Sequence, residues 1–189
     1  MYRIAVTNRH LCEEDFLVRV ERLAEETYYH AILLREKDLT EEEYESLARD
    51  VLAICQKRNK KCILHTYSEV ALRLKHPYVH LPLSRWRSLK DAEQCQLREN
   101  MCEIGTSVHS LEQWEQAKAL GASYVVAGHI FATDCKKGLA PRGVPFLQTI
   151  CQAADVPVYG IGGISRENEE QVIHAGAAGV CIMSGCMKG

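Results

Sequence analysis

The stretch ALGASYVVAG, residues 119–128, decides the fold of this chain. It has the pattern of a helix end, a glycine at Gly121 that can take the left-handed position after a helix, a buried strand, and a second glycine at Gly128 that opens a loop. The same pattern returns near the end of the chain, where residues 174–185 read HAGAAGVCIMSG. This echo predicts a chain built by repeating one helix-to-strand unit.

Short apolar runs alternate with amphipathic stretches along the whole chain. The pattern predicts eight strands, at residues 2–7, 31–34, 62–65, 78–81, 103–108, 124–127, 158–161 and 179–183. Helix starts lie between them, because Thr40, Ser110 and Ser165 each place a capping hydroxyl ahead of acidic or amide residues. Strands that are separated by helices pair in parallel.

Eight such units close a (β/α)8 barrel, the TIM barrel, which is the α/β fold that we predict. Such a barrel usually takes about 250 residues, whereas this chain ends at Gly189, soon after the eighth strand. We therefore expect a short barrel whose last helix is largely missing, with a doubly wound open sheet as the alternative. No linker, low-complexity run or charge block divides the chain, so residues 1–189 are predicted to form a single domain.

The composition narrows the class of function. A formal net charge of -2 gives no basic excess, which argues against nucleic acid as a partner. No apolar run approaches the roughly 18 residues of a spanning helix. The first residues also lack the apolar core of a secretion signal, so we expect no membrane partner and a cytoplasmic location. The nine cysteines contain no Cys-x-x-Cys pair and fit buried free thiols better than a zinc site.

Two loops concentrate the chemistry. The first, GHIFATDCKKG at residues 128–138, gathers a histidine, a hydroxyl, a thiol and two lysines after a buried strand. The second, VYGIGGIS at residues 158–165, runs from an apolar strand into a glycine pair and a helix cap. That arrangement is a way to present backbone N–H groups to a phosphate. Together the loops predict an enzyme that acts on a small-molecule phosphate ester.

Five motifs, in order, carry a resemblance to a known family. They are LREK (34–37), GTSVHS (105–110), GHIFATDCKKG (128–138), IGGI (161–164) and MSG (183–185). With these motifs the chain resembles the thiamine phosphate synthase and TenI superfamily. The resemblance spans nearly the whole chain and implies a (β/α)8 barrel that handles the thiazole phosphate half of thiamine.

The superfamily holds two activities, and departures from its motifs separate them. The synthase typically holds a magnesium pyrophosphate with an Asn-Asp pair after the third strand and an acidic residue after the fourth. This chain reads His65-Thr66 at the first place and HLPLS at residues 80–84. It also carries Leu33 where the synthase usually has a glutamine. Mg²⁺ prefers carboxylate and water oxygens, and these places offer no carboxylate. The pattern therefore disfavours the synthase and favours the other activity of the superfamily, thiazole tautomerisation, and we expect no metal and no cofactor.

The second activity is that of the TenI-like thiazole tautomerases, which aromatise a carboxythiazole phosphate by moving the ring C2 proton to an exocyclic carbon. In that family a histidine after the sixth-strand glycine is the acid/base group, and it is matched here by His129; Cys135 also matches the tautomerase form. Histidine suits proton transfer because its unperturbed pKa is about 6.5. The resemblance therefore implies an isomerase with His129 as its catalytic residue.

The two anionic groups of that substrate need binding partners. Barrels commonly bind phosphate in the loops after strands seven and eight. The residues that we predict to bind the phosphate are Gly162, Gly163, Ser184 and Gly185. For the carboxylate we predict Arg35 and Lys136, and we expect Thr133 to orient the ligand by a hydrogen bond.

Two alternatives stay open at this point. One is thiamine phosphate synthase itself, which couples pyrimidine pyrophosphate to thiazole phosphate with magnesium held by ligands elsewhere in the chain. The other is a non-catalytic protein that binds thiazole phosphate or regulates thiamine genes, since a fold does not guarantee chemistry. A homodimer is also left open, because related proteins are often dimers.

Overall fold

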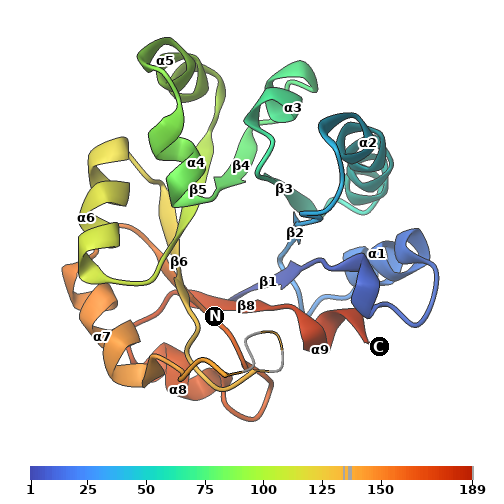
Figure 1. Cartoon of the computed structure of the whole chain (residues 1–189). Helices are drawn as coiled ribbons and strands as arrows, with labels where there is room; N and C mark the ends of the chain where they lie inside the picture. The colour runs from blue at the N-terminus through green and yellow to red at the C-terminus, as the bar shows by residue number, and fades with distance from the viewer. Residues whose placement is uncertain (134, 136–137, 189) are drawn as a thin grey trace.

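In the computed structural model, eight parallel strands form a closed barrel in sequence order (Figure 1). The structure describes residues 1–133, 135 and 138–188. The strands are β1 (Tyr2–Val6), β2 (Ala31–Leu34), β3 (Lys61–His65), β4 (Tyr78–Leu81), β5 (Glu103–Val108), β6 (Tyr124–Gly128), β7 (Val158–Ile161) and β8 (Gly179–Ile182). Because β1 pairs with both β2 and β8, the sheet closes and the open-sheet alternative is excluded. The predicted barrel is confirmed, and each strand lies within one residue of its predicted bounds.

Helices cover the outside of the barrel (Figure 1). They are the 3-10 helix η1 (Arg9–Leu11) and the helices α1 (Phe16–Glu25), α2 (Glu41–Lys57), α3 (Ser68–Arg73), α4 (Leu83–Ser88), α5 (Asp91–Asn100), α6 (Leu111–Leu120), α7 (Gly143–Ala153), α8 (Glu169–His174) and α9 (Ser184–Met187). None of the helices in the described part of the chain has both the length and the apolar character needed to cross a membrane.

Two of the three predicted helix caps are present. The Thr40 hydroxyl accepts from the Glu43 N–H while the Glu43 carboxylate accepts from the Thr40 N–H, a complete capping box at the start of α2. At the start of α6 the Ser110 hydroxyl accepts from the Gln113 N–H, which is a single capping hydrogen bond. The Ser165 hydroxyl accepts from the Glu167 N–H at 3.3 Å and the Ser165 N–H donates to the Asn168 side chain at 2.9 Å, so Ser165 caps the turn that leads into α8 and not α8 itself. A turn therefore forms first, and α8 begins only after Asn168.

The last helix, α9, is short, as predicted. Its C-terminal end packs against α1 and β1. Arg19 of α1 donates from Nε to the Cys186 carbonyl at 2.7 Å, and the Cys186 sulfur lies 3.5 Å from the Val6 carbonyl oxygen. Cys186 and Met187 are both buried. These contacts fix the C-terminal turn beside β1, so Ser184 stands at the same rim as the loops after the other strands.

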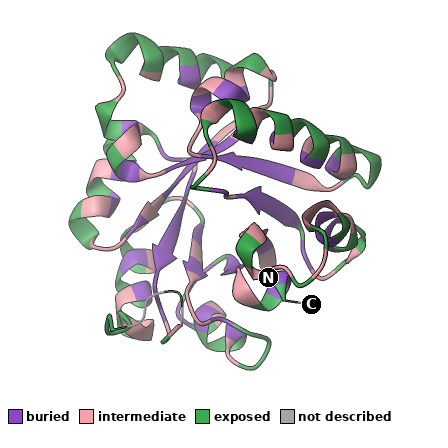
Figure 2. Ribbon diagram, turned by 45° about the vertical axis from the view of Figure 1, so that its right-hand side comes forward, coloured by how far each residue is buried: buried purple, intermediate pink, exposed green. Residues whose placement is uncertain are grey.

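Buried apolar side chains form two clusters. The larger lies between strands and helices and contains the fully buried Trp86 and Leu147. The smaller lies inside the barrel and includes Val6, Leu33 and Val126. In Figure 2 the strands are buried while the helices expose their outer faces. The packed barrel thus holds the loops after its strands in fixed positions at one rim.

Candidate active site

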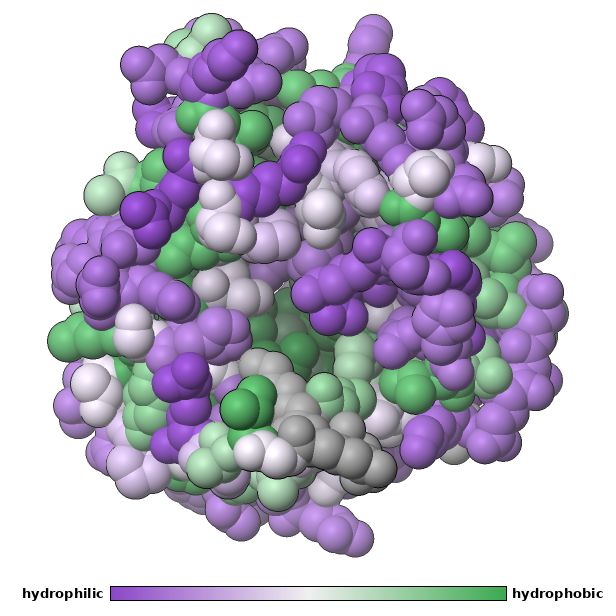
Figure 3. Space-filling model, viewed as in Figure 1, coloured by the Kyte–Doolittle hydropathy of each residue, from purple (hydrophilic) through white to green (hydrophobic). Residues whose placement is uncertain are grey.

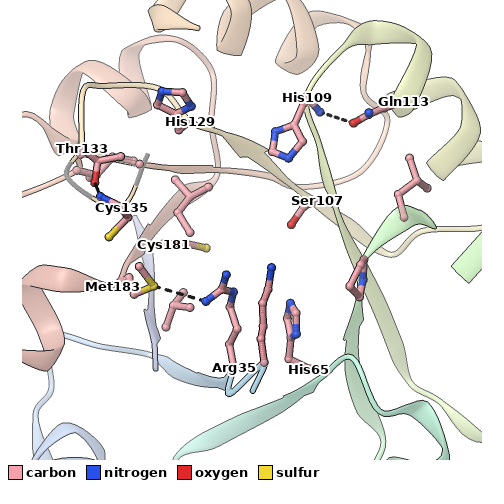
Figure 4. A pocket seen from close by; sticks show the side chains of 18 of the residues that line it. Arg35, His65, Ser107, His109, Gln113, His129, Thr133, Cys135, Cys181 and Met183 are labelled. Carbon is pink, nitrogen blue, oxygen red and sulfur yellow. Dashed lines mark hydrogen bonds between the residues drawn. The ribbon is translucent and has the colours of Figure 1, made fainter. Parts of the chain in front are cut away.

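A cavity of about 450 Å³ opens at the carboxyl ends of the strands. Figure 3 shows this face hollowed near its centre, with hydrophilic side chains around the recess and hydrophobic ones within it. Its wall includes Arg35 after β2, His65 on β3, Ser107 on β5, His129 after β6 and Gly162 after β7 (Figure 4). These residues are distant in sequence and meet because parallel strands end at one rim.

The loop after β6 seats His129 against the loop after β7. The Ile130 N–H donates to the Ile161 carbonyl at 2.9 Å, and the Phe131 N–H donates to the Gly162 carbonyl at 2.9 Å. Gly162 has a φ of +106°, and a Cβ at this position would lie 2.4 Å from the Cβ of His129. Only glycine allows so close an approach in this conformation.

The second glycine of the pair completes the seat. Gly163 has a φ of +63°, and a Cβ there would lie 2.3 Å from the Ala132 carbonyl oxygen. The Gly163 carbonyl in turn accepts from the Asn168 side chain at 2.9 Å. The glycine pair therefore makes room for the loop that carries His129, a role that the sequence did not reveal.

His129 is almost enclosed although it borders the cavity. The residue is only 6% exposed, and its Nε2 is buried with no hydrogen-bond partner among the residues that the structure describes. Well over 90% of buried backbone polar groups, and most buried side-chain polar atoms, are paired in folded proteins. The unpaired imidazole nitrogen of His129 therefore has a hydrogen bond still to make, with a ligand or with water.

His109 holds the same loop from the side of β5. Its Nδ1 donates to the Gly128 carbonyl at 2.6 Å, one residue before His129. Its backbone N–H donates to the Gln113 side chain at 2.8 Å, so the backbone at His109 is anchored to the start of α6 (Figure 4). His109 thus positions the loop that carries His129.

Arg35 extends into the cavity from the end of β2 (Figure 4). One guanidinium nitrogen lies 3.9 Å from the Met183 sulfur, and burial lowers the pKa of the group. The neighbouring carboxylate, Glu36, is hydrogen-bonded elsewhere. It accepts from the Thr7 hydroxyl at 2.7 Å and from the Arg9 N–H at 3.1 Å. The Arg35 charge is therefore directed to the cavity.

The cavity wall is cationic. Its described residues include Arg35, Lys37 and Arg87 and no aspartate or glutamate. A cleft lined by one sign of charge concentrates ligands of the opposite sign. The wall therefore favours an anionic ligand.

The residues at the places where a synthase holds magnesium do not fit that ion. The Thr66 hydroxyl lies 2.5 Å from His65 Nδ1, and burial lowers the pKa of His65 well below its usual value. At the end of β4 the cavity wall is formed by Pro82, Leu83 and Ser84. In the described part of the chain, no three His, Cys, Asp or Glu side chains group as metal ligands. A hard cation prefers several carboxylate oxygens, which this donor set lacks.

Most of the predicted site residues come together. Those that line the cavity are Arg35, His129, Thr133, Gly162, Gly163 and Ser184. The Thr133 hydroxyl accepts from the Cys135 N–H at 3.4 Å, and the Cys135 thiol borders the same cavity (Figure 4). Gly185 follows Ser184 in α9 but does not line the cavity wall. Lys136 lies outside the described residues.

Several lining groups were not predicted from the sequence. They are His65, Arg87, Ser107, Gln113, Gln116, Cys181 and Met183. Ser107 could have been found, because it lies in a quoted motif near the carboxyl end of a predicted strand. Arg87 could not, since it belongs to α4 and no local pattern distinguishes it from a surface cation.

Comparisons with known proteins show the family of the chain. Residues 3–186 match the family described as thiamine monophosphate synthase. The thiamine-phosphate synthase of Roseiflexus sp. is 31% identical over 95% of this chain and 75% of that protein. Thiamine-phosphate synthase 2 of Streptococcus pneumoniae is 31% identical over 97% and 86%. The thiamine phosphate pyrophosphorylase structure from Pyrococcus furiosus has a TM-score of 0.83 and 25% identity, over 100% of this chain and 88% of that one. The chain therefore belongs to the thiamine monophosphate synthase family of thiamine biosynthesis.

Proposed function

We propose that this protein is a thiazole tautomerase that aromatises a carboxythiazole phosphate. The observation that carries the proposal is His129, an imidazole at the cavity wall that two loops hold in place and that keeps one unpaired ring nitrogen among the described residues. A positioned acid/base group typically contributes about 10²- to 10⁴-fold to a proton transfer. The cationic wall supports an anionic substrate in the same place.

In the proposed reaction, the neutral imidazole of His129 takes the proton from C2 of the non-aromatic ring. The electron pair of that C–H bond enters the ring, and the exocyclic double bond takes up the proton as the imidazolium returns it. One C–H bond breaks and one forms, so no oxidant, reductant or metal is consumed. Because the product ring is aromatic, the reaction runs downhill.

Arg35 is the proposed partner of the substrate carboxylate. Negative charge builds on the ring and its carboxylate while C2 is deprotonated, and a guanidinium can meet a carboxylate with two parallel hydrogen bonds. Arg35 borders the same cavity as His129, which supports the assignment. Lys136 was predicted for the same task and stays a prediction, as does the orienting role of Thr133.

The phosphate is proposed to bind among Gly162, Gly163, Ser184 and Gly185. The packing of the glycine pair excludes side chains, whereas phosphate binding would use backbone N–H groups, so one pair can serve both purposes. The position of these residues after β7 and β8 supports the assignment, because barrels commonly bind phosphate there.

Thiamine phosphate synthase is the second candidate, and the names of the relatives favour it. Three cavity cations, Arg35, Lys37 and Arg87, would suit a pyrophosphate. Against it stand the residues at the magnesium positions, which offer an imidazole and hydroxyls in place of carboxylates. A non-catalytic thiazole phosphate binder is the third reading, and it predicts ligand binding without turnover.

One experiment separates the three readings. Purified protein is given carboxythiazole phosphate alone, or thiazole phosphate with pyrimidine pyrophosphate and magnesium. The tautomerase produces the aromatic carboxythiazole from the first mixture. The synthase produces thiamine phosphate from the second, and the binder produces neither although calorimetry detects the ligand.

His129→Asn should lower tautomerisation by about 10²-fold or more while substrate affinity stays nearly unchanged. His174→Asn is the matched control, because His174 is an exposed residue of α8 outside the cavity wall. It should keep the wild-type rate. Wild-type turnover in His129→Asn would remove the histidine from the mechanism.

A further inference from the structure

Three polar groups inside the barrel have no part in the proposed proton transfer. The Ser107 hydroxyl lines the cavity (Figure 4), and its oxygen lies 2.9 Å from His80 Nε2. The other ring nitrogen, His80 Nδ1, lies 3.2 Å from the Tyr124 hydroxyl. His80 is 2% exposed and Tyr124 is 4% exposed. A buried chain of hydrogen bonds thus runs from the barrel interior to the cavity wall.

The sheet register explains how the chain forms. His80 on β4 pairs with Gly105 on β5, and Gly105 pairs with Tyr124 on β6, so the three lie in one row across three strands. A Cβ at Gly105 would lie 2.0 Å from the Cζ of Tyr124. The absent side chain therefore lets the tyrosine ring cross over β5 to reach His80. Ser107 is two residues beyond Gly105 on the same face of β5.

The hydrogen bonds fix where each proton lies. Burial lowers the pKa of His80 to about 3, so the ring is neutral and has one donor and one acceptor nitrogen. Burial also raises the pKa of Tyr124 well above its usual value, so the phenol keeps its proton. Among the described residues, the acceptor for that proton is His80 Nδ1.

The opposite tautomer of His80 would leave the Tyr124 O–H without an acceptor. If Nδ1 carried the ring proton, the buried Tyr124 O–H would have no acceptor among the described residues, and the Ser107 proton would be spent on Nε2. An unpaired buried donor carries its full desolvation penalty. The favoured order is Tyr124 to His80 Nδ1, then His80 Nε2 to Ser107. Ser107 accepts in that bond, so its own proton is directed elsewhere.

We propose that Tyr124, acting through His80, holds Ser107 as a hydrogen-bond donor aimed at the ligand in the cavity. Ser107 then selects a ligand with an acceptor atom at this place. It is not activated as a nucleophile, because His80 Nε2 donates a hydrogen bond to its oxygen and does not accept its proton. Tyr124 and His80 are positioning residues. The identity of the ligand rests on the proposed function, since carboxythiazole phosphate offers carboxylate oxygens and a ring nitrogen as acceptors.

The first test needs no ligand. Nitrogen-15 NMR of the free protein at neutral pH reports which imidazole nitrogen is protonated, and the His80 signals are assigned by their loss in His80→Gln. We expect a protonated Nε2 and an unprotonated Nδ1. A ring protonated at Nδ1, or at both nitrogens, would overturn the proposal. This readout stays decisive even if the proposed function fails because carboxythiazole phosphate does not bind.

The second test is a double-mutant cycle on the affinity for carboxythiazole phosphate, measured by calorimetry. Ser107→Ala should weaken binding by about tenfold, and Tyr124→Phe by about threefold. In the Ser107→Ala background, Tyr124→Phe should cause no further loss, because it acts only through Ser107. Losses that simply multiply would show that Tyr124 is merely structural and would refute the proposal.

Tyr159→Phe is the matched control. Its ring lies 5.6 Å from that of Tyr124 in the same interior, and neither tyrosine lines the cavity at the carboxyl ends of the strands. Among the described residues, the hydroxyl that is bonded to His80 Nδ1 belongs to Tyr124 and not to Tyr159. Removing its hydroxyl should leave affinity and the His80 spectrum unchanged. A threefold loss in this variant would mean that any interior tyrosine affects binding, and the specific role of Tyr124 would fall.

Discussion

Gly162→Ala should displace His129 and slow the proposed proton transfer while the barrel stays folded. The added Cβ would lie 2.4 Å from the Cβ of His129 and 2.8 Å from its Cα, whereas packed carbon atoms sit about 3.5–4.0 Å apart. The loop after β6 must therefore move by roughly 1 Å, and a displacement of that size at a catalytic group can lower the rate by about 10²-fold.

Stability should fall in the same variant. Alanine at a φ of +106° is strained by about 1–2 kcal/mol, and the overpacked contact adds about 1–3 kcal/mol. A domain of this size loses roughly 2–4 °C in Tm for each kcal/mol. We therefore expect Tm to fall by roughly 4–20 °C.

Gly121→Ala is the control that isolates the clash from the backbone strain. Gly121 has a φ of +83°, and a Cβ there meets nothing within 4 Å. It should lose about 1–2 kcal/mol and keep the wild-type kcat. Urea unfolding and the rate of aromatisation, followed by absorbance, measure both quantities. If the two variants lose equal stability and both keep the wild-type kcat, Gly162 does not seat His129.

Three other changes test the charge and protonation of the site. Arg35→Gln should raise KM for carboxythiazole phosphate by about tenfold, and an unchanged KM in initial-rate assays would remove Arg35 from substrate binding. A chelator should leave the tautomerisation rate unchanged, whereas a coupling reaction that the chelator abolishes would move the assignment to the synthase. Burial lowers the pKa of His80 to about 3 and that of His65 in the same direction. The unfolded chain therefore binds more protons than the folded chain below about pH 6.5. As the pH is lowered, the free energy of unfolding should fall by up to about 1.4 kcal/mol per pH unit for each histidine. Urea titrations of wild type and His80→Gln between pH values of about 4 and 7 check this, and equal slopes would contradict it.

The fold was predictable because its signals are local. A short apolar run predicts a buried strand. The capping box at Thr40 can be predicted from residues within four positions of each other. The pattern at Ser165 is equally local, and its hydroxyl does cap a turn. Asn168 binds both the Ser165 N–H and the Gly163 carbonyl, and the regular helix starts only after Asn168.

The site was predictable only in part because its contacts are not local. His129 could be found by its place after a strand, but the sequence does not reveal that the glycine pair exists to make room for its loop. The row that joins His80 to Tyr124 depends on the register of three strands. Residues 105 and 124 are 19 positions apart, and only the closed sheet makes them neighbours.

The polar row also bears on why the barrel interior is built this way. Such interiors are usually filled by branched apolar side chains, yet here His65 stacks on His80 with ring centroids 5.4 Å apart, and His80 binds Tyr124. Burying neutral polar rings is tolerable only when their hydrogen bonds are satisfied, and the register with Gly105 provides that. An apolar row could pack as well but could not set the direction of the Ser107 proton. The chemistry of the cavity therefore extends one layer into the barrel, where substitutions that keep volume and lose a single hydroxyl should alter ligand affinity as well as stability.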